Sequence, residues 1–323
     1  MSLSVNDINT LVTACHTAPN QVLGLSADQN NGRLRITCYF PHIKNIESVE
    51  ILALLPGKKA SEFGNKESTK SLGKLLKVHD SGLYSLILRR KNTFNYRFRV
   101  ITTEETLLID DAYFFEPCLG ELDIYLLNEG NHQKPYEKLG AHQRIKLLNG
   151  QNVHGVSFSV WAPNASHVSL IGDFNLWDER SHPMQNIACN NAASGYWNIF
   201  IPNAVAGQQY KFAIKDKNGT ALPFKADPYG NQAQYRPDTA SIIGAIDNFA
   251  WKDQNWLAER EKRNSRNAPI SIYEVHLGSW RRSETNEFLN YREIADQLIP
   301  YTLEMGFTHL QLMPVSEFPF DGS

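Results

Sequence analysis

Three acidic residues lie near the predicted ends of strands in the last quarter of this chain: Glu274, Glu317 and Asp321. Two carboxyl groups held close together can serve as a nucleophile and as an acid that later acts as a base. We nevertheless assign no catalytic residue. Glu274 is interpreted as a structural acid at a strand end, and the other two are expected to shape a loop.

Two histidines also stand where a base could act, His276 and His309, but both lie inside apolar runs. A hydrogen-bonded core histidine is favoured over a catalytic one at each position. The four cysteines lie far apart without a C-x-x-C pair, which favours free thiols over a zinc site or a disulfide framework: Cys15, Cys38, Cys118 and Cys189. The sequence shows no cluster of metal ligands and no glycine-rich phosphate loop, so no metal and no cofactor are expected.

The charge pattern points to a neutral ligand. The net charge is -2 and both signs are interspersed, so the chain offers no broad cationic surface for a nucleic acid or an anionic membrane. Aromatic residues make up 11% of the chain, which suits a ligand held by stacking, although most of these rings should be core. The N-terminus lacks a signal-peptide pattern and no window approaches the ~20 apolar residues of a membrane span. A cytoplasmic location is expected.

An internal repeat organises the first two thirds of the chain. Alternating apolar runs bounded by Gly, Pro and Asn are typical of half-buried antiparallel strands. The same order of such runs occurs twice, which predicts two consecutive β-sandwiches, at about 22–115 and 136–243. A short helix is expected before the first. The repeated runs are 34–39 and 156–160, 48–52 and 168–172, 82–88 and 195–201, and 95–100 and 209–214.

A different pattern follows the second sandwich. Residues 251–267 are strongly charged and predict a solvated helix. The apolar run 268–276 predicts a strand buried on both faces, 290–305 a helix capped by Asn290, and 307–314 a second strand. Strand, helix and strand in this order predict a right-handed parallel unit. Two parallel strands and one helix cannot close a barrel.

Several motifs give this chain a family resemblance. The stretches Tyr273-Glu-Val-His-Leu-Gly-Ser-Trp280 and Met313-Pro-x-x-Glu-x-Pro-Phe-Asp-Gly-Ser323 look like the opening of the catalytic barrel of glycogen branching enzymes. Trp161-Ala-Pro-Asn-Ala165, Gly172-Asp-Phe-Asn-Leu-Trp-Asp178 and Ala226-Asp-Pro-Tyr229 resemble the glucan-associated β-sandwich of amylase-family branching and debranching enzymes. The duplicated sandwich is similar to the additional N-terminal domain of many bacterial branching enzymes.

The resemblance implies a complete fold and domain plan. It predicts two consecutive all-β immunoglobulin-like sandwiches followed by the first β-α-β unit of an incomplete (β/α)8 barrel. The predicted domains are 1–115 with the short leading helix, 116–250 of glucan-module type, and 251–323 with the linker helix and the start of the barrel.

The resemblance also implies a chemistry: retaining transfer of an α-1,4-glucan segment to a 6-hydroxyl of another chain, without a cofactor. In amylase-type barrels the acting carboxylates follow strands four, five and seven, so this chain by itself is expected to be inactive. Matched positions predict that Trp177 and Lys211 contact glucan, whereas Trp161 and Trp197 are expected in the core. A monomer is expected. The alternatives are a non-catalytic glucan-binding protein and a glycogen-debranching relative.

Overall fold

The computed structural model describes residues 3–27, 32–55, 69–189, 192–235, 237–245 and 250–315. Contacts along the chain divide it into two compact units, 1–246 and 247–323. The finer division at residues 115 and 250 stays a prediction. Within the described ranges, each helix is too short or too polar to cross a lipid bilayer.

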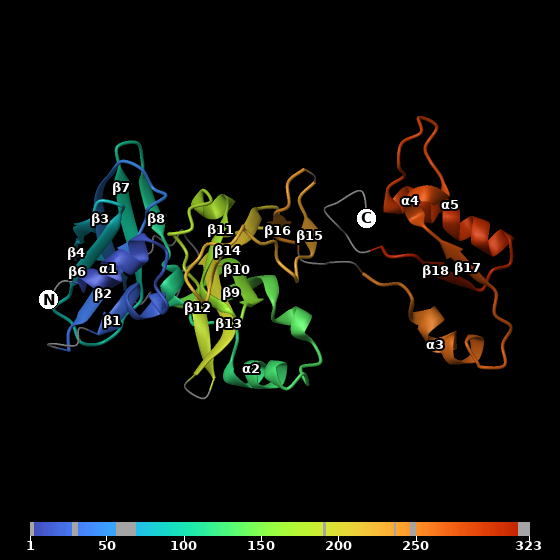
Figure 1. Ribbon diagram of the computed structural model, residues 1–323, viewed down its shortest axis with the longest axis horizontal. Coiled ribbons are helices and arrows are strands. Elements are labelled where there is room, and N and C mark those ends of the chain that lie inside the picture. The colour runs from blue at the N-terminus through green and yellow to red at the C-terminus, as the bar shows by residue number, and fades with distance from the viewer. Residues whose placement is uncertain are drawn as a thin grey trace, which may run out of the picture. The chain divides into compact units, whose positions relative to one another are not determined.

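Two four-stranded antiparallel sheets form the first half of unit 1 (Figure 1). Their strand orders are β1-β2-β6-β5 and β4-β3-β7-β8. Alternate side chains of both sheets meet in one apolar core, so Ile36 and Ile51 are fully buried, as are Phe98 and Val100. The elements are α1 (Val5–Val12), η1 (Pro19–Gln21), β1 (Gly24–Ala27), β2 (Leu34–Tyr39), β3 (Ile46–Leu54), β4 (Thr69–Lys74), β5 (Leu76–His79), β6 (Leu83–Ile87), β7 (Tyr96–Thr102), β8 (Thr106–Ile109) and η2 (Ala112–Phe114).

The second half of unit 1 repeats this plan with the sheets β12-β13-β10-β9 and β11-β14-β16-β15. Its core contains Phe158, Leu170, Trp197 and Phe212. The elements are α2 (Glu121–Asn128), η3 (Pro135–Glu137), β9 (Gly140–Leu148), β10 (Gln151–Trp161), β11 (Ala165–Gly172), η4 (Asp173–Asn175), β12 (Gln185–Cys189), β13 (Ala192–Pro202), β14 (Gln209–Asp216), β15 (Gln232–Ala233) and β16 (Ser241–Ile242).

The strand pairing confirms the repeat that the sequence predicted. β2 pairs with β6 as β10 pairs with β13, and β3 pairs with β7 as β11 pairs with β14, all antiparallel. The repeat also includes the leading helix, which was expected only once. Asp7 lies 3.4 Å from His16, and Asp123 lies 3.4 Å from His132 in the segment that begins with α2. Each member of the second pair stands 116 positions after its counterpart.

A buried tyrosine closes each sandwich in the same way. The Tyr96 hydroxyl donates to Asp111 Oδ2 at 2.6 Å, and Asp111 Oδ1 accepts the Tyr113 backbone N–H at 2.9 Å. Because burying a carboxylate without partners is costly, these donors fix the segment after β8 against β7. The equivalent bonds of the second sandwich are 2.7 and 2.8 Å long, and its residues are Tyr210, Asp227 and Tyr229.

Two equivalent glycines of the two sandwiches, Gly82 just before β6 and Gly195 within β13, provide a stability test. Gly82 has φ +101° and its missing Cβ would lie against the Phe40 backbone, while Gly195 has φ +80° and abuts Pro163. Gly219 also has a positive φ, but open space surrounds it. Gly195→Ala is therefore expected to cost about 1 kcal/mol more than Gly219→Ala. Urea unfolding of the two variants measures the difference, and equal midpoints would contradict it.

Unit 2 contains a parallel pair of short strands with a helix between them. β17 (Ile272–Val275) pairs with β18 (His309–Leu312), and α5 (Tyr291–Glu304) connects them, as predicted. The Asn290 side chain accepts the Arg292 and Glu293 backbone N–H groups at 3.0 Å, and Glu293 accepts the Asn290 N–H at 2.8 Å. This capping box begins the helix. The remaining elements are α3 (Gln254–Arg263), which is exposed as expected, and α4 (Leu277–Trp280).

Pro300 lies inside α5, where both it and Asp296, whose carbonyl loses its donor, are exposed. One expectation for unit 2 needs correction. The strands are not buried on both faces: β18 is exposed throughout, and of β17 only Val275 is buried, against Ile294 and Leu298 of α5. A single helix covers only one face of a two-stranded sheet.

Candidate functional site

The loop 172–178 carries one of the two predicted site residues and is built around a buried asparagine. Asn175 is 0% exposed. Its Oδ1 accepts the Gly172 backbone N–H at 2.9 Å, and its Nδ2 donates to the Leu170 carbonyl at 2.9 Å. Nδ2 also lies 2.9 Å from His182 Nδ1. Beyond Gly172 the strand hydrogen bonds of β11 end, and the Asn175 side chain bonds the backbone there instead. The turn therefore has a defined shape.

Trp177 lies on the outer side of this loop. Leu176 and Trp177 both have left-handed backbones, with φ of +53° and +62°, a conformation that costs non-glycine residues roughly 1 kcal/mol or more each. The Trp177 backbone N–H donates to the Gly172 carbonyl at 3.0 Å, and its indole Nε1–H donates to Asp173 Oδ1 at 3.1 Å. The indole is only partly buried. A strained backbone therefore holds a tryptophan at the surface.

Lys211 projects from β14 on the face opposite the core. Tyr210 and Phe212 are both 0% exposed, and Lys211 between them is partly exposed, as the alternation predicted. Its ammonium group donates to Thr239 Oγ1 at 2.8 Å. An ammonium group has three N–H donors, so one bond leaves two for a ligand.

The strand register brings these two residues to one end of a strand pair. Gly172 of β11 lies opposite Tyr210 of β14. Asp173, which holds the indole, also accepts the Gln209 backbone N–H at 2.7 Å through Oδ2. The loop that presents Trp177 is thus fastened two residues from Lys211, on the same strand.

The two other tryptophans of this sandwich differ in burial. Trp197 is 1% exposed and donates from Nε1 to the Ala162 carbonyl at 3.1 Å, which confirms it as core. Trp161 is 58% exposed, so its expected core position is wrong. Val160 and Phe158 face the core, and Trp161 follows on the opposite face of β10, stacked on Tyr196 with ring centroids 6.2 Å apart. Alternation within 156–161 was the signal that would have identified this surface aromatic residue.

Among the described residues of unit 2, the acids and histidines singled out in the sequence form no pair that could act as acid and base together. Glu274 is exposed and accepts a hydrogen bond from Gln311 Nε2 at 2.9 Å. Glu317 and Asp321 lie outside the described residues. His276 and His309 are hydrogen-bonded, to Ser279 and Thr308, but both are exposed, so the core position expected for them is wrong. Within the described ranges, no group of three histidine, cysteine or acidic side chains is placed to hold a metal.

Two family models and a curated relative match this chain. Residues 4–113 match the family described as alpha-1,4-glucan branching enzyme GlgB, N-terminal domain, and residues 138–230 match carbohydrate-binding module 48, the isoamylase N-terminal domain. The chain is 42% identical over 320 residues to the 1,4-alpha-glucan branching enzyme GlgB of Rhodospirillum rubrum. Along almost its whole length the chain is thus similar to the N-terminal part of GlgB branching enzymes. The match covers 98% of this chain and 40% of that relative, so the chain spans less than half of its length.

The chain also has distant likenesses among solved structures. Pullulanase type I from Bacillus subtilis, complexed with maltose, is 15% identical with a TM-score of 0.39, and the likeness covers 88% of this chain and 36% of the pullulanase. A ligand-free PulA mutant from Klebsiella pneumoniae is 18% identical with a TM-score of 0.38, over 91% and 29% of the two chains.

Proposed function

We propose that this chain supplies the α-glucan-binding N-terminal part of a 1,4-α-glucan branching enzyme that acts in cytoplasmic glycogen synthesis. The observation that carries the proposal is the link through Asp173, which accepts from the Trp177 indole and from the Gln209 backbone, two residues before Lys211. One hydrogen-bonded loop and one strand hold the two partly exposed side chains of the second sandwich. Similarity to GlgB supports glucan as the ligand.

The two side chains suit a neutral sugar. The face of an indole packs against the apolar C–H face of a pyranose, and lysine N–H groups donate to its hydroxyl oxygens. Asp173 fixes the orientation of the indole, so little side-chain freedom remains to be lost on binding. The stretch 217–224 contains no second tryptophan that would sandwich the sugar. The proposed site is therefore a weak one that gains strength when many glucan chains are presented together.

The chemical step is proposed for the whole enzyme. A carboxylate displaces the glucan at an α-1,4 bond and holds it covalently, and a 6-hydroxyl of a second chain takes it over with the same configuration. In this proposal β17, α5 and β18 form the first unit of the (β/α)8 barrel that carries those carboxylates, and the 323 residues alone bind glucan without transferring it. A monomer is proposed as the working form.

Co-sedimentation with glycogen tests the binding site. Trp177→Ala removes the stacking face and is expected to weaken retention about 3- to 10-fold, and Lys211→Ala is expected to weaken it less. Trp161→Ala is the matched control, because Trp161 is an exposed tryptophan of the same sandwich outside the loop. Unchanged retention of Trp177→Ala would overturn the proposed site, and a loss confined to Trp161→Ala would move the site to β10.

A further inference from the structure

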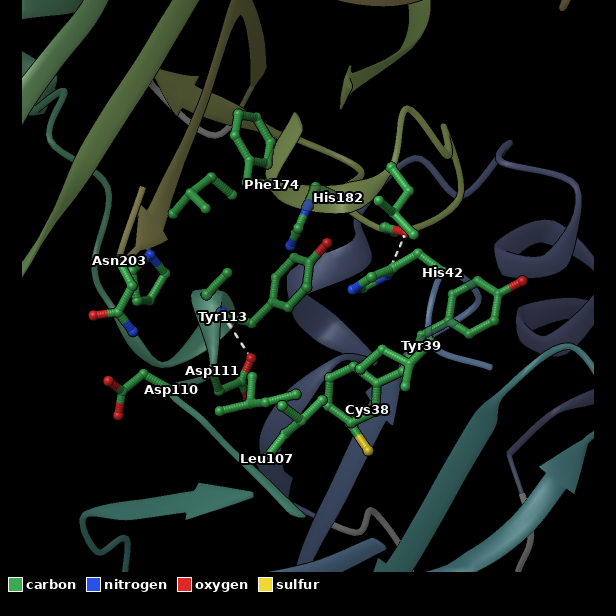
Figure 2. A pocket seen from close by; sticks show the side chains of 18 of the residues that line it. Cys38, Tyr39, His42, Leu107, Asp110, Asp111, Tyr113, Phe174, His182 and Asn203 are labelled. Carbon is green, nitrogen blue, oxygen red and sulfur yellow. Dashed lines mark hydrogen bonds between the residues drawn. The ribbon is translucent and has the colours of Figure 1, made fainter. Parts of the chain in front are cut away.

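A cavity of about 460 Å³ lies between the two sandwiches, within unit 1 (Figure 2). One wall comes from β2, β8 and η2 of the first sandwich, and the other from the loop 173–182 and the end of β13. Asp173, Phe174 and Leu176 line it. The loop that carries Trp177 therefore also forms part of the cavity wall.

The walls are mainly apolar and aromatic. Figure 2 shows the rings of Tyr113 and Phe174 on either side of His182. The Tyr113 hydroxyl is already engaged with the Pro183 carbonyl at 2.9 Å, so its ring rather than its hydroxyl is available to a ligand. Apolar walls with a few polar groups, and a volume between about 300 and 1,000 Å³, are typical of small-molecule sites.

The acidic groups of the cavity wall are neutralised or bonded by the protein itself. Asp110 forms an ion pair with Arg97. Asp111 accepts from Tyr96 and from the Tyr113 backbone, and Asp173 accepts from Trp177 and from the Gln209 backbone. A cation would have to compete with these donors. The wall therefore favours a ligand without charge.

Polar groups with spare hydrogen-bonding capacity also reach the cavity. His42 uses Nδ1 towards Ser181 Oγ at 2.9 Å, and His182 uses Nδ1 towards Asn175 Nδ2 at 2.9 Å. No hydrogen bond of either Nε2 is found within the described residues, nor one of the Asn203 side-chain amide, labelled in Figure 2. Burial lowers the pKa of both imidazoles, that of His182 to about 3, so both are neutral at pH 7. Neutral imidazoles and an amide pair well with hydroxyl groups.

We propose that this cavity is a second carbohydrate site, which takes one or two glucose units from the end of an α-glucan chain. The choice of an α-glucan rests on the proposed function, whereas a neutral, hydroxyl-rich ligand follows from the walls alone. Because both sandwiches contribute to the walls, the site requires the first sandwich, which has no equivalent of Trp177. Loop 172–178 thus contacts glucan on both of its sides.

Saturation-transfer NMR with maltose tests the proposal on the full 323-residue chain. Leu107→Trp fills the cavity, since Leu107 lines it. Leu108→Trp is the matched control, because Leu108 is the next residue of β8, points to the other side and is 61% exposed. All variants are made in a Trp177→Ala background, which removes the proposed surface site but leaves Asp173 bonded to Gln209. In that background maltose affinity is expected to fall at least 5-fold on adding Leu107→Trp and to stay unchanged on adding Leu108→Trp.

Each other outcome counts against the cavity. Equal maltose affinity with and without Leu107→Trp in folded protein, or no maltose signal from the wild type at millimolar concentration, would overturn it. Loss of all maltose binding on Trp177→Ala itself would overturn it while supporting the proposed function. If Leu107→Trp fails to fold, Asn203→Gly decides: the backbone φ of +61° accepts glycine. Loss of affinity in that variant supports the cavity, and unchanged affinity overturns it.

Discussion

Trp197→Ala is expected to lower the free energy of unfolding by about 3 to 5 kcal/mol, the usual cost of removing a fully buried tryptophan. The indole is 1% exposed and packs in the core of the second sandwich with Phe158 and Phe212. Its Nε1–H donates to the Ala162 carbonyl, which loses this partner in the variant. Urea unfolding followed by far-ultraviolet circular dichroism measures the change.

Trp161→Ala is the matched control for this experiment. The variant removes the same side-chain atoms at a neighbouring position, since Trp161 follows Val160, the residue that lies opposite Trp197. The Trp161 side chain is, however, 58% exposed. A cost below about 1 kcal/mol is expected, since little apolar surface returns to water. Comparable losses in both variants would mean that the surface stacking of Trp161 on Tyr196 contributes as much as the core.

The antiparallel strands were predictable because their signal is local. In β7 and β14 a buried tyrosine and a buried phenylalanine alternate with the outward Arg97 and Lys211, and this pattern alone fixes which face is core. The start of α5 was predictable for the same reason, since Asn290 and Glu293 cap the backbone within one turn.

Features that depend on distant contacts were harder to predict. The second helix, α2, was missed, although its Asp123 and His132 repeat the Asp7 and His16 pair at a constant spacing of 116. A search for polar residues at fixed offsets, and not only for apolar runs, would have found it. The cavity could not be predicted, because His42 and Ser181, 139 residues apart, meet only when the two sandwiches pack.

The candidate site was predictable in its residues but not in its geometry. Trp177 and Lys211 came from motif positions, and alternation gave the direction of Lys211. The link through Asp173 needs the register of β11 and β14, which pairs Gly172 with Tyr210. The exposure of His276 and His309 was not predictable from apolar neighbours, since it depends on how many layers cover β17 and β18.

A fall in pH from 7.5 to 5.5 is expected to destabilise unit 1 by about 2 kcal/mol. Burial lowers the pKa of His167 to about 4 and that of His182 to about 3. Below the ordinary histidine pKa of about 6.5, the unfolded chain binds protons at these histidines and the folded chain does not. The free energy of unfolding is therefore highest above pH 6.5 and falls as the pH drops towards 4. Each histidine accounts for about 1.4 kcal/mol over this interval.

Asp111 has the opposite effect on how stability changes with pH. Burial raises its pKa to about 6, so the folded state holds a proton that the unfolded state has released between about pH 4 and pH 6. Stability therefore rises as the pH falls through 6, by a little under about 1 kcal/mol at pH 5.5. The difference leaves the net loss of about 2 kcal/mol, measured as the change in the urea midpoint between pH 7.5 and pH 5.5.

His182→Gln tests the origin of this loss. The glutamine carbonyl can still accept from Asn175, but it does not titrate, so the loss on acidification should shrink by about two thirds. His154→Gln, which replaces an exposed histidine of β10, is the matched control. An unchanged pH dependence in His182→Gln would contradict the assignment.

His167 binds the His16 carbonyl at 2.9 Å and thereby joins the second sandwich to the segment after α1. Acid is therefore expected to weaken the contact between the two sandwiches, where the cavity lies, before it unfolds either core.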